Sequence, residues 1–131
     1  MKTTAQVVVI GGGVVGCSVL YHLTKKGWKD VMLLERDQLT SGSTWHAAGG
    51  FHTLNGDPNV AMLQSYTVSL YEELERISGQ SCGLHKSPGI MLADTPERME
   101  FLKMTVARGR YLGMATEIIS VKEAKTYFPF I

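Results

Sequence analysis

The hydrophobic and polar positions along this chain change from a strand period to a helix period and back within the first third. Residues 7–10 are four consecutive β-branched residues, which predicts a short strand buried on both faces, as in a parallel sheet. A helical pattern follows over residues 14–26, and the apolar run at residues 31–34 predicts a second buried strand. This order of elements predicts a β–α–β unit.

Beyond residue 50 the pattern is mainly helical. Asp57, followed by proline, predicts the start of a helix that ends at Gly79. A second cap-and-proline pair predicts a helix over residues 96–112, and Ser120 begins the capping box of a last short helix. Apolar residues recur at helical spacing in the first of these helices and are expected to face the core: Leu63, Tyr66, Leu70, Leu74 and Ile77.

Short strands are expected between these helices. Residues 82–86 and 90–93 flank a Ser-Pro-Gly turn and predict an antiparallel hairpin. Residues 116–119 predict a further strand.

The turn after the first predicted strand fits the pattern G-x-G-x-x-G. Gly11 occupies the position that makes the tight turn, and Gly13 the position where a pyrophosphate approaches the backbone closely. Gly16 occupies the position where the helix packs closely on the strand. Glu35 ends the second strand 19 residues after Gly16, where an acid accepts hydrogen bonds from ribose hydroxyls. The alternative is a glycine-rich turn in an ordinary α/β domain with a solvated glutamate. The complete set of accessory features favours a dinucleotide site.

Small residues dominate from residue 41 to residue 50, but they surround one tryptophan and one histidine, Trp45 and His46. Small side chains let a flat cofactor approach the backbone, and residues 42–44 can donate backbone and hydroxyl hydrogen bonds to phosphate. A flexible turn is the plainer interpretation, but it does not explain the two ring side chains.

Composition narrows the functional classes. The net charge of +1 suggests neither nucleic acid nor a membrane as a partner, and no apolar run approaches the ~20 residues of a membrane span. Cys17 and Cys82 match no zinc or redox spacing, and the four histidines form no helical pair with other ligands, so no metal site is expected. Neither a signal peptide nor an Arg-rich presequence is visible, so the expected location is the cytoplasm.

A doubly wound domain needs about five or six parallel strands, and only two are convincing here. The last residues, 127–131, are apolar and have no closing helix or polar tail. We therefore expect these 131 residues to be the N-terminal portion of a larger protein.

The segment Glu35-Arg36 followed by Leu39-Thr40-Ser41-Gly42-Ser43-Thr44-Trp45-His46-Ala47-Ala48-Gly49 resembles the dimethylglycine and sarcosine dehydrogenase family. That family belongs to the glycine-oxidase and D-amino-acid-oxidase class of flavoproteins. The likeness extends over essentially the whole chain, including residues 71–75, residues 89–93 and the terminal Phe128-Pro129. Its specific part is the Ser-Thr-Trp-His-Ala-Ala-Gly run.

The resemblance implies FAD as the cofactor, and its attachment histidine corresponds to His46, which bonds to the flavin 8α carbon. The resemblance implies that the family's catalytic residues and its folate-binding domain lie beyond Ile131, so no residue of this chain is assigned those roles. The residues expected to bind the cofactor, from the motif and the resemblance together, are Gly11, Gly13, Val14, Val15, Gly16, Glu35, Arg36, Gly42, Ser43, Thr44, Trp45, His46, Ala47, Ala48, Gly49 and Gly50.

The expected function is oxidative N-demethylation of a small N-methylated amino acid such as dimethylglycine or sarcosine, by hydride transfer to flavin. Expected partners are the substrate, the rest of the same polypeptide, an electron-transfer flavoprotein and, through a domain outside this chain, tetrahydrofolate. Three alternatives stay open: a non-catalytic regulatory relative, a flavin amine oxidase that uses oxygen, and a fragment that has no activity by itself.

The expected fold class is therefore α/β. Residues 1–50 form a Rossmann-type FAD-binding unit with the flavin-attachment loop. Residues 51–131 form a helix, a hairpin, a helix and a strand, which begin a mixed α+β substrate-side domain.

Overall fold

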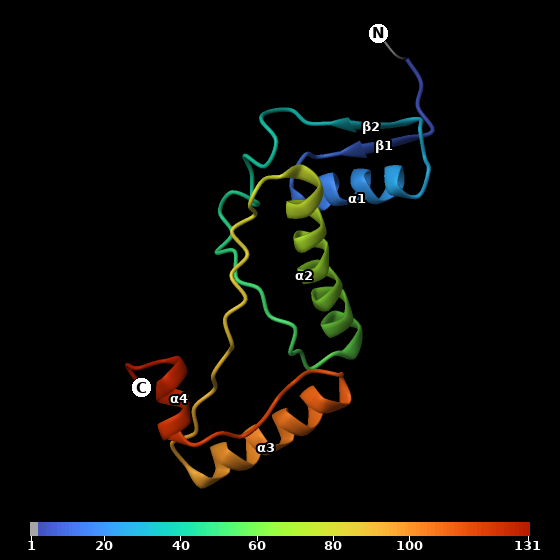
Figure 1. Cartoon of the computed structure of the whole chain (residues 1–131). Coiled ribbons are helices and arrows are strands. Elements are labelled where there is room, and N and C mark those ends of the chain that lie inside the picture. The colour runs from blue at the N-terminus through green and yellow to red at the C-terminus, as the bar shows by residue number, and fades with distance from the viewer. Residues whose placement is uncertain (1–2) are drawn as a thin grey trace. The chain divides into compact units, whose positions relative to one another are not determined.

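The computed structural model describes residues 3–131. The chain divides into two compact units, Met1–Gly50 and Phe51–Ile131. In the first unit, the order is β1 (Val7–Ile10), α1 (Val14–Lys25) and β2 (Val31–Leu34) (Figure 1). The strands are parallel and pair in register from Val7↔Val31 to Ile10↔Leu34, and α1 packs against both. The predicted β–α–β unit is confirmed.

The strands are covered on one face only, so the prediction that the first strand is buried on both faces is wrong. Val7 and Val9 are half-buried, whereas Val8 is 46% exposed and Ile10 is 86% exposed. Successive side chains of a strand point to opposite faces. The single helix α1 covers one of those faces and leaves the other open among the described residues.

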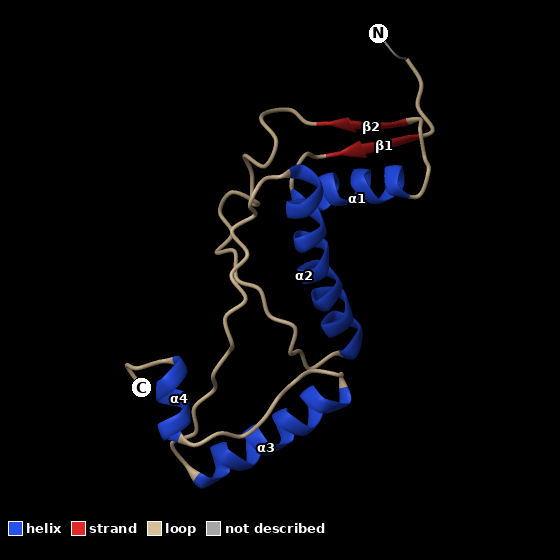
Figure 2. Ribbon diagram, viewed as in Figure 1, coloured by secondary structure: helices blue, strands red, loops and turns tan. Residues whose placement is uncertain are grey.

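The second unit holds three helices: α2 (Pro58–Ser78), α3 (Pro96–Tyr111) and α4 (Val121–Tyr127) (Figure 2). All three predicted N-caps are confirmed. Asp57 Oδ1 accepts hydrogen bonds from Asn59 N and Val60 N at 2.7 and 3.1 Å. The hydroxyl groups of Thr95 and Ser120 accept one backbone N–H each, from Arg98 at 3.1 Å and from Glu123 at 3.2 Å.

The predicted apolar stripe of α2 is only partly buried. Leu70 is buried and Leu74 is half-buried, but Leu63, Tyr66 and Ile77 are 63%, 45% and 55% exposed. Helical spacing does place these residues along one side of the helix. Within the described residues, however, no two helices of this unit pack against each other, so most of the stripe has no covering element.

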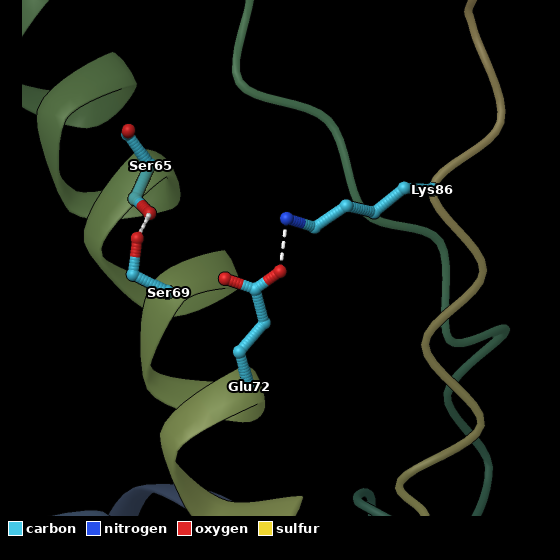
Figure 3. Close-up of polar contacts among 4 residues, drawn as sticks. All are labelled: Ser65, Ser69, Glu72 and Lys86. Carbon is cyan, nitrogen blue, oxygen red and sulfur yellow. Dashed lines mark hydrogen bonds and ion pairs between the residues drawn. The ribbon is translucent and has the colours of Figure 1, made fainter.

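Residues 80–93 are extended and form no strand, so the predicted hairpin is wrong (Figure 2). The segment binds α2 through side chains instead. Lys86 forms an ion pair with Glu72 (Figure 3), and Glu75 Oε1 accepts hydrogen bonds from Cys82 N at 2.6 Å and from Ser81 Oγ at 3.2 Å. An isolated two-stranded hairpin is marginal in water, and Pro88 has no N–H to contribute to a ladder.

Residues 116–119 likewise form no strand, and that prediction is also wrong. Thr116 returns to α3, where its hydroxyl donates to the Val106 carbonyl at 3.1 Å and its own carbonyl accepts from Arg110 Nε at 3.3 Å. Its side chain fills the space beside Gly109, which is buried within α3. Thr116 is thus bonded to a helix rather than to a sheet.

Gly109→Ala should destabilise the second unit despite the higher helix propensity of alanine. An added Cβ would lie 2.6 Å from both Thr116 Cγ2 and Thr116 Oγ1. Overpacking of this kind costs about 1–3 kcal/mol, against a propensity gain of about 1 kcal/mol. Urea unfolding of the full-length polypeptide measures the change. In a Thr116→Gly background, which also removes the Thr116 Cβ at 3.1 Å, the sign should reverse, and equal effects in both backgrounds would contradict the contact.

Candidate functional site

The first unit places its glycines as the motif requires. Gly11 has a φ of +103°, and its N–H donates to the Leu34 carbonyl at 2.8 Å, which turns the chain sharply after β1. A Cβ on Gly16 would lie 1.9 Å from the Gly11 carbonyl oxygen. The tight turn and the close helix packing therefore exist, because these two positions carry no side chain.

The N-terminus of α1 keeps two unbonded donors. Val14 N donates to Thr44 Oγ1 at 2.9 Å, and Cys17 N donates to the Gly13 carbonyl at 2.9 Å. In the part of the chain that the structure describes, the N–H groups of Val15 and Gly16 have no hydrogen-bond partner. First-turn N–H groups have no acceptor within a helix and carry its positive end, so they suit an anionic oxygen.

Glu35 extends from the end of β2 to the glycine turn. Its Oε2 accepts a hydrogen bond from Gly12 N at 2.6 Å, and its Oε1 accepts one from Asp37 N at 3.0 Å. The Gly12 N–H, and after it the Asp37 N–H, hold the pKa of the Glu35 carboxyl below its ordinary value of 4.5. Each carboxylate oxygen keeps a second lone pair, so the group can also accept from a ribose hydroxyl.

Glu35→Gln should reduce stability in a pH-dependent manner. Because the pKa of Glu35 is lowered on folding, its contribution is complete above pH 4.5 and is lost as the pH falls through the folded-state pKa. The urea midpoint of the variant should thus be lower than that of the wild type at neutral pH, and the difference should shrink in acid. Glu117→Gln, at an exposed glutamate, is the control. A difference that does not change with pH would contradict the assignment.

A cleft of about 400 Å³ opens beside the glycine turn, at the carboxyl ends of β1 and β2. In open α/β sheets, ligands bind outside this end of the strands. The lining is small and polar, with one guanidinium and two carboxylates. The residues are Gly13, Glu35, Arg36, Asp37, Thr40, Ser41, Gly42, Ser43 and Thr44.

The loop over residues 39–46, part of which lines the cleft, carries His46. Residues 39–46 form consecutive hydrogen-bonded turns rather than a regular helix. The exposed His46 ring returns toward the cleft rim, where Nδ1 lies 2.9 Å from the Gly42 carbonyl oxygen. A carbonyl only accepts, so Nδ1 carries the proton and Nε2 holds the free lone pair. The site therefore presents a nucleophilic imidazole nitrogen on a loop bound to the glycine turn.

Six predicted residues line the cleft together: Gly13, Glu35, Arg36, Gly42, Ser43 and Thr44. Gly11, Val14, Val15 and Gly16 build the turn and the first turn of the helix next to it. The rest of the predicted set lies outside the lining, and contact of those residues with a cofactor stays a prediction: Trp45, His46, Ala47, Ala48, Gly49 and Gly50.

Sequence reasoning missed four residues of the site: Gly12, Asp37, Thr40 and Ser41. Gly12 is buried, its N–H donates to Glu35, and its carbonyl accepts from Thr40 N at 2.9 Å. A signal for Gly12 was present in the sequence. The motif accepts any residue at this position, so a third consecutive glycine there was informative. No sequence signal marks Thr40.

Among residues 3–131, no group of three or more His, Cys, Asp and Glu side chains is arranged to hold a metal ion. No described helix has both the length and the apolar character that a bilayer crossing requires.

A family model described as FAD dependent oxidoreductase matches residues 6–131. The chain is 41% identical over 130 residues to "Dimethylglycine dehydrogenase, mitochondrial" of Rattus norvegicus and 38% identical over 132 residues to "Sarcosine dehydrogenase, mitochondrial" of Homo sapiens. It is also 39% identical over 131 residues to "Pyruvate dehydrogenase phosphatase regulatory subunit, mitochondrial" of Mus musculus. These alignments cover 99–100% of the chain but only 14–15% of the relatives. The resemblance inferred from the sequence is confirmed.

A solved structure supports the fold. The L-proline dehydrogenase from P. horikoshii matches 98% of the chain with a TM-score of 0.86 and 26% identity, over 34% of its own length. The predicted FAD-binding fold class is confirmed.

Proposed function

Because this chain belongs to the FAD dependent oxidoreductase family, we propose that the polypeptide containing it oxidatively demethylates a small N-methylated amino acid. The single observation that carries the proposal is the geometry of the first unit. One cleft joins the open N-terminus of α1, the acid that ends β2 and the loop that presents His46. The names of the dimethylglycine and sarcosine dehydrogenases suggest the substrate class.

The residues of the cleft and of the adjoining first turn of α1 fit the adenosine diphosphate part of FAD. The free N–H groups of Val15 and Gly16 suit a phosphate oxygen, and a Cβ on Gly13 would lie 3.0 Å from Thr44 Oγ1 and narrow the approach. Glu35 would accept from the ribose, and Arg36 would offset the phosphate charge. When bound, FAD supplies the chemistry, acceptance of a hydride from the substrate's N-methyl carbon.

We propose that His46 holds the flavin covalently through Nε2. The hydrogen bond from Nδ1 to the Gly42 carbonyl fixes the tautomer that leaves the Nε2 lone pair free. The C–N bond to the 8α carbon would replace one C–H bond of that methyl group. One proton would leave the methyl carbon and one the imidazole, and dioxygen would accept the two electrons and two protons as hydrogen peroxide.

Anaerobic reduction of the full-length holoprotein tests the proposed function. Dimethylglycine or sarcosine should bleach the visible flavin absorbance and yield formaldehyde in equal amount, because the oxidised N-methyl carbon is lost on hydrolysis. Glycine, which has no N-methyl group, is the control. Bleaching by neither methylated amine would contradict the proposal.

A second candidate is a non-catalytic regulatory protein, which the 39% identity to a phosphatase regulatory subunit favours. Such a protein would not be reduced by either methylated amine. An amine oxidase would be reduced but would then form hydrogen peroxide rapidly when air is admitted. The same experiment thus separates the three functions.

A further inference from the structure

Thr40 adopts a backbone conformation that its side chain disfavours. Its φ is +68°, and it is the only non-glycine residue among residues 3–131 with a positive φ. For a β-branched residue this left-handed conformation is a genuine outlier, and such outliers persist only where surrounding contacts determine them. Thr40 also lines the cleft beside the glycine turn.

Hydrogen bonds on both sides of Thr40 maintain the conformation. Its N–H donates to the Gly12 carbonyl at 2.9 Å, and its carbonyl accepts from Trp45 N at 3.1 Å. The side chain of the preceding Leu39 packs against Gly12: a Cβ added to Gly12 would lie 2.5 Å from Leu39 Cδ2. Thr40 is therefore bonded to the glycine turn through its N–H and to the attachment loop through its carbonyl.

The reversal at Thr40 determines where the rest of the loop goes. After it, the chain makes the turns that place the Thr44 hydroxyl 2.9 Å from Val14 N and the His46 ring 2.9 Å from the Gly42 carbonyl. A residue restricted to negative φ at position 40 would send the following residues in another direction. The Thr44 hydroxyl would then not reach Val14 N, and the His46 ring, together with its partner Gly42, would move away from the glycine turn.

We propose that Thr40 is a positioning residue for cofactor attachment. Its left-handed backbone, bonded to Gly12, holds the loop over residues 39–47 so that His46 meets the flavin bound at the glycine turn. The inference rests on the proposed covalent role of His46. The role belongs to the backbone of Thr40, not to its hydroxyl group.

Three variants of the full-length polypeptide, prepared without flavin, separate these roles. Thr40→Pro removes the N–H and fixes φ near about −65°. Thr40→Asn keeps the N–H and tolerates the left-handed region. Thr40→Val keeps the branched shape and replaces the hydroxyl with a methyl group.

Two rates are measured for each variant: amide hydrogen exchange at Val14 and Trp45, and covalent flavin incorporation at saturating FAD. Thr40→Pro should raise the exchange rate at Val14 and lower the incorporation rate, each by about tenfold or more, since Val14 loses its acceptor on Thr44. Exchange at Trp45 should rise less, because its N–H also donates to the Gly42 carbonyl at 3.1 Å. Thr40→Asn and Thr40→Val should stay within about twofold of the wild type in both rates, because both variants keep the backbone hydrogen bonds.

Wild-type rates in Thr40→Pro would overturn the proposal, and so would impaired incorporation in Thr40→Asn or Thr40→Val. If Thr40→Pro does not fold, as judged by exchange in the middle of α1, the other two variants still decide. If the wild type itself attaches no flavin, the proposed function of His46 fails. The exchange rates then still test the positioning of the loop, so the two failures are distinguishable.

Discussion

Full-length protein carrying His46→Ala should lose all acid-stable flavin while still binding FAD without a covalent bond. The ring nitrogen is the proposed attachment atom, whereas the proposed phosphate and ribose contacts come from the turn, α1 and Glu35. Loss of the covalent bond should leave a dissociable cofactor and a lower flavin reduction potential, since substitution at the 8α carbon withdraws electron density. Flavin fluorescence on a denaturing gel measures attachment, and dialysis measures retention.

His85→Ala is the matched control, because His85 is exposed and lies in the second unit, outside the cleft. It should attach flavin as the wild type does. Acid-stable flavin in the His46→Ala protein would show that another residue carries the cofactor. Loss of it in both variants would show that the effect is not specific to His46.

Gly16→Ala should have the largest effect on the structure of the first unit. A Cβ at this position would lie 1.9 Å from the Gly11 carbonyl oxygen, and backbone cannot move aside as a flexible side chain can. Either α1 separates from β1 or the turn at Gly11 opens, and each change destroys the cleft. We expect a loss of about 3 kcal/mol or more in unfolding free energy and no retention of FAD.

Gly89→Ala is the control for Gly16→Ala. Gly89 has no atom within 4 Å of an added Cβ and does not have a positive φ, so the substitution should change stability by less than about 0.5 kcal/mol. Urea unfolding and FAD retention after gel filtration provide the two measurements. FAD retention by Gly16→Ala equal to that of the wild type would contradict the close packing of helix and strand.

The first unit could be predicted from the sequence because its determinants are local. Four β-branched residues, three spaced glycines and an acid at the end of the next strand define β1, the turn and β2 within about one motif length. The N-caps at Asp57, Thr95 and Ser120 were predictable for the same reason, since a cap depends on residues within one helical turn.

The predictions of strands after residue 80 failed because the conformation of a segment there depends on which other segment it contacts. Residues 82–86 have strand composition but bind the side chains of Glu72 and Glu75, and Thr116 binds α3. Similarly, the periodicity of α2 specifies a side of the helix but not whether another element covers it. A sequence pattern indicates the propensity of a segment to form a strand, but a strand also needs a hydrogen-bonding partner for its backbone groups.

The site was predictable in its residue types but not in its connections. Glycine, acid and histidine could be selected from spacing and resemblance, yet the contacts of Gly12 with Glu35 and Thr40 depend on a backbone path between two segments. The left-handed conformation of Thr40 has no signature in residue type, since threonine disfavours it.

Peptide mapping of the acid-denatured, full-length holoprotein tests the central claim most directly. The claim is that FAD lies at the glycine turn and is bound covalently through His46. After denaturation and proteolysis, the peptide containing His46 should carry the added mass of FAD, and the acid supernatant should contain no flavin. Free flavin in the supernatant together with an unmodified His46 peptide would contradict the account.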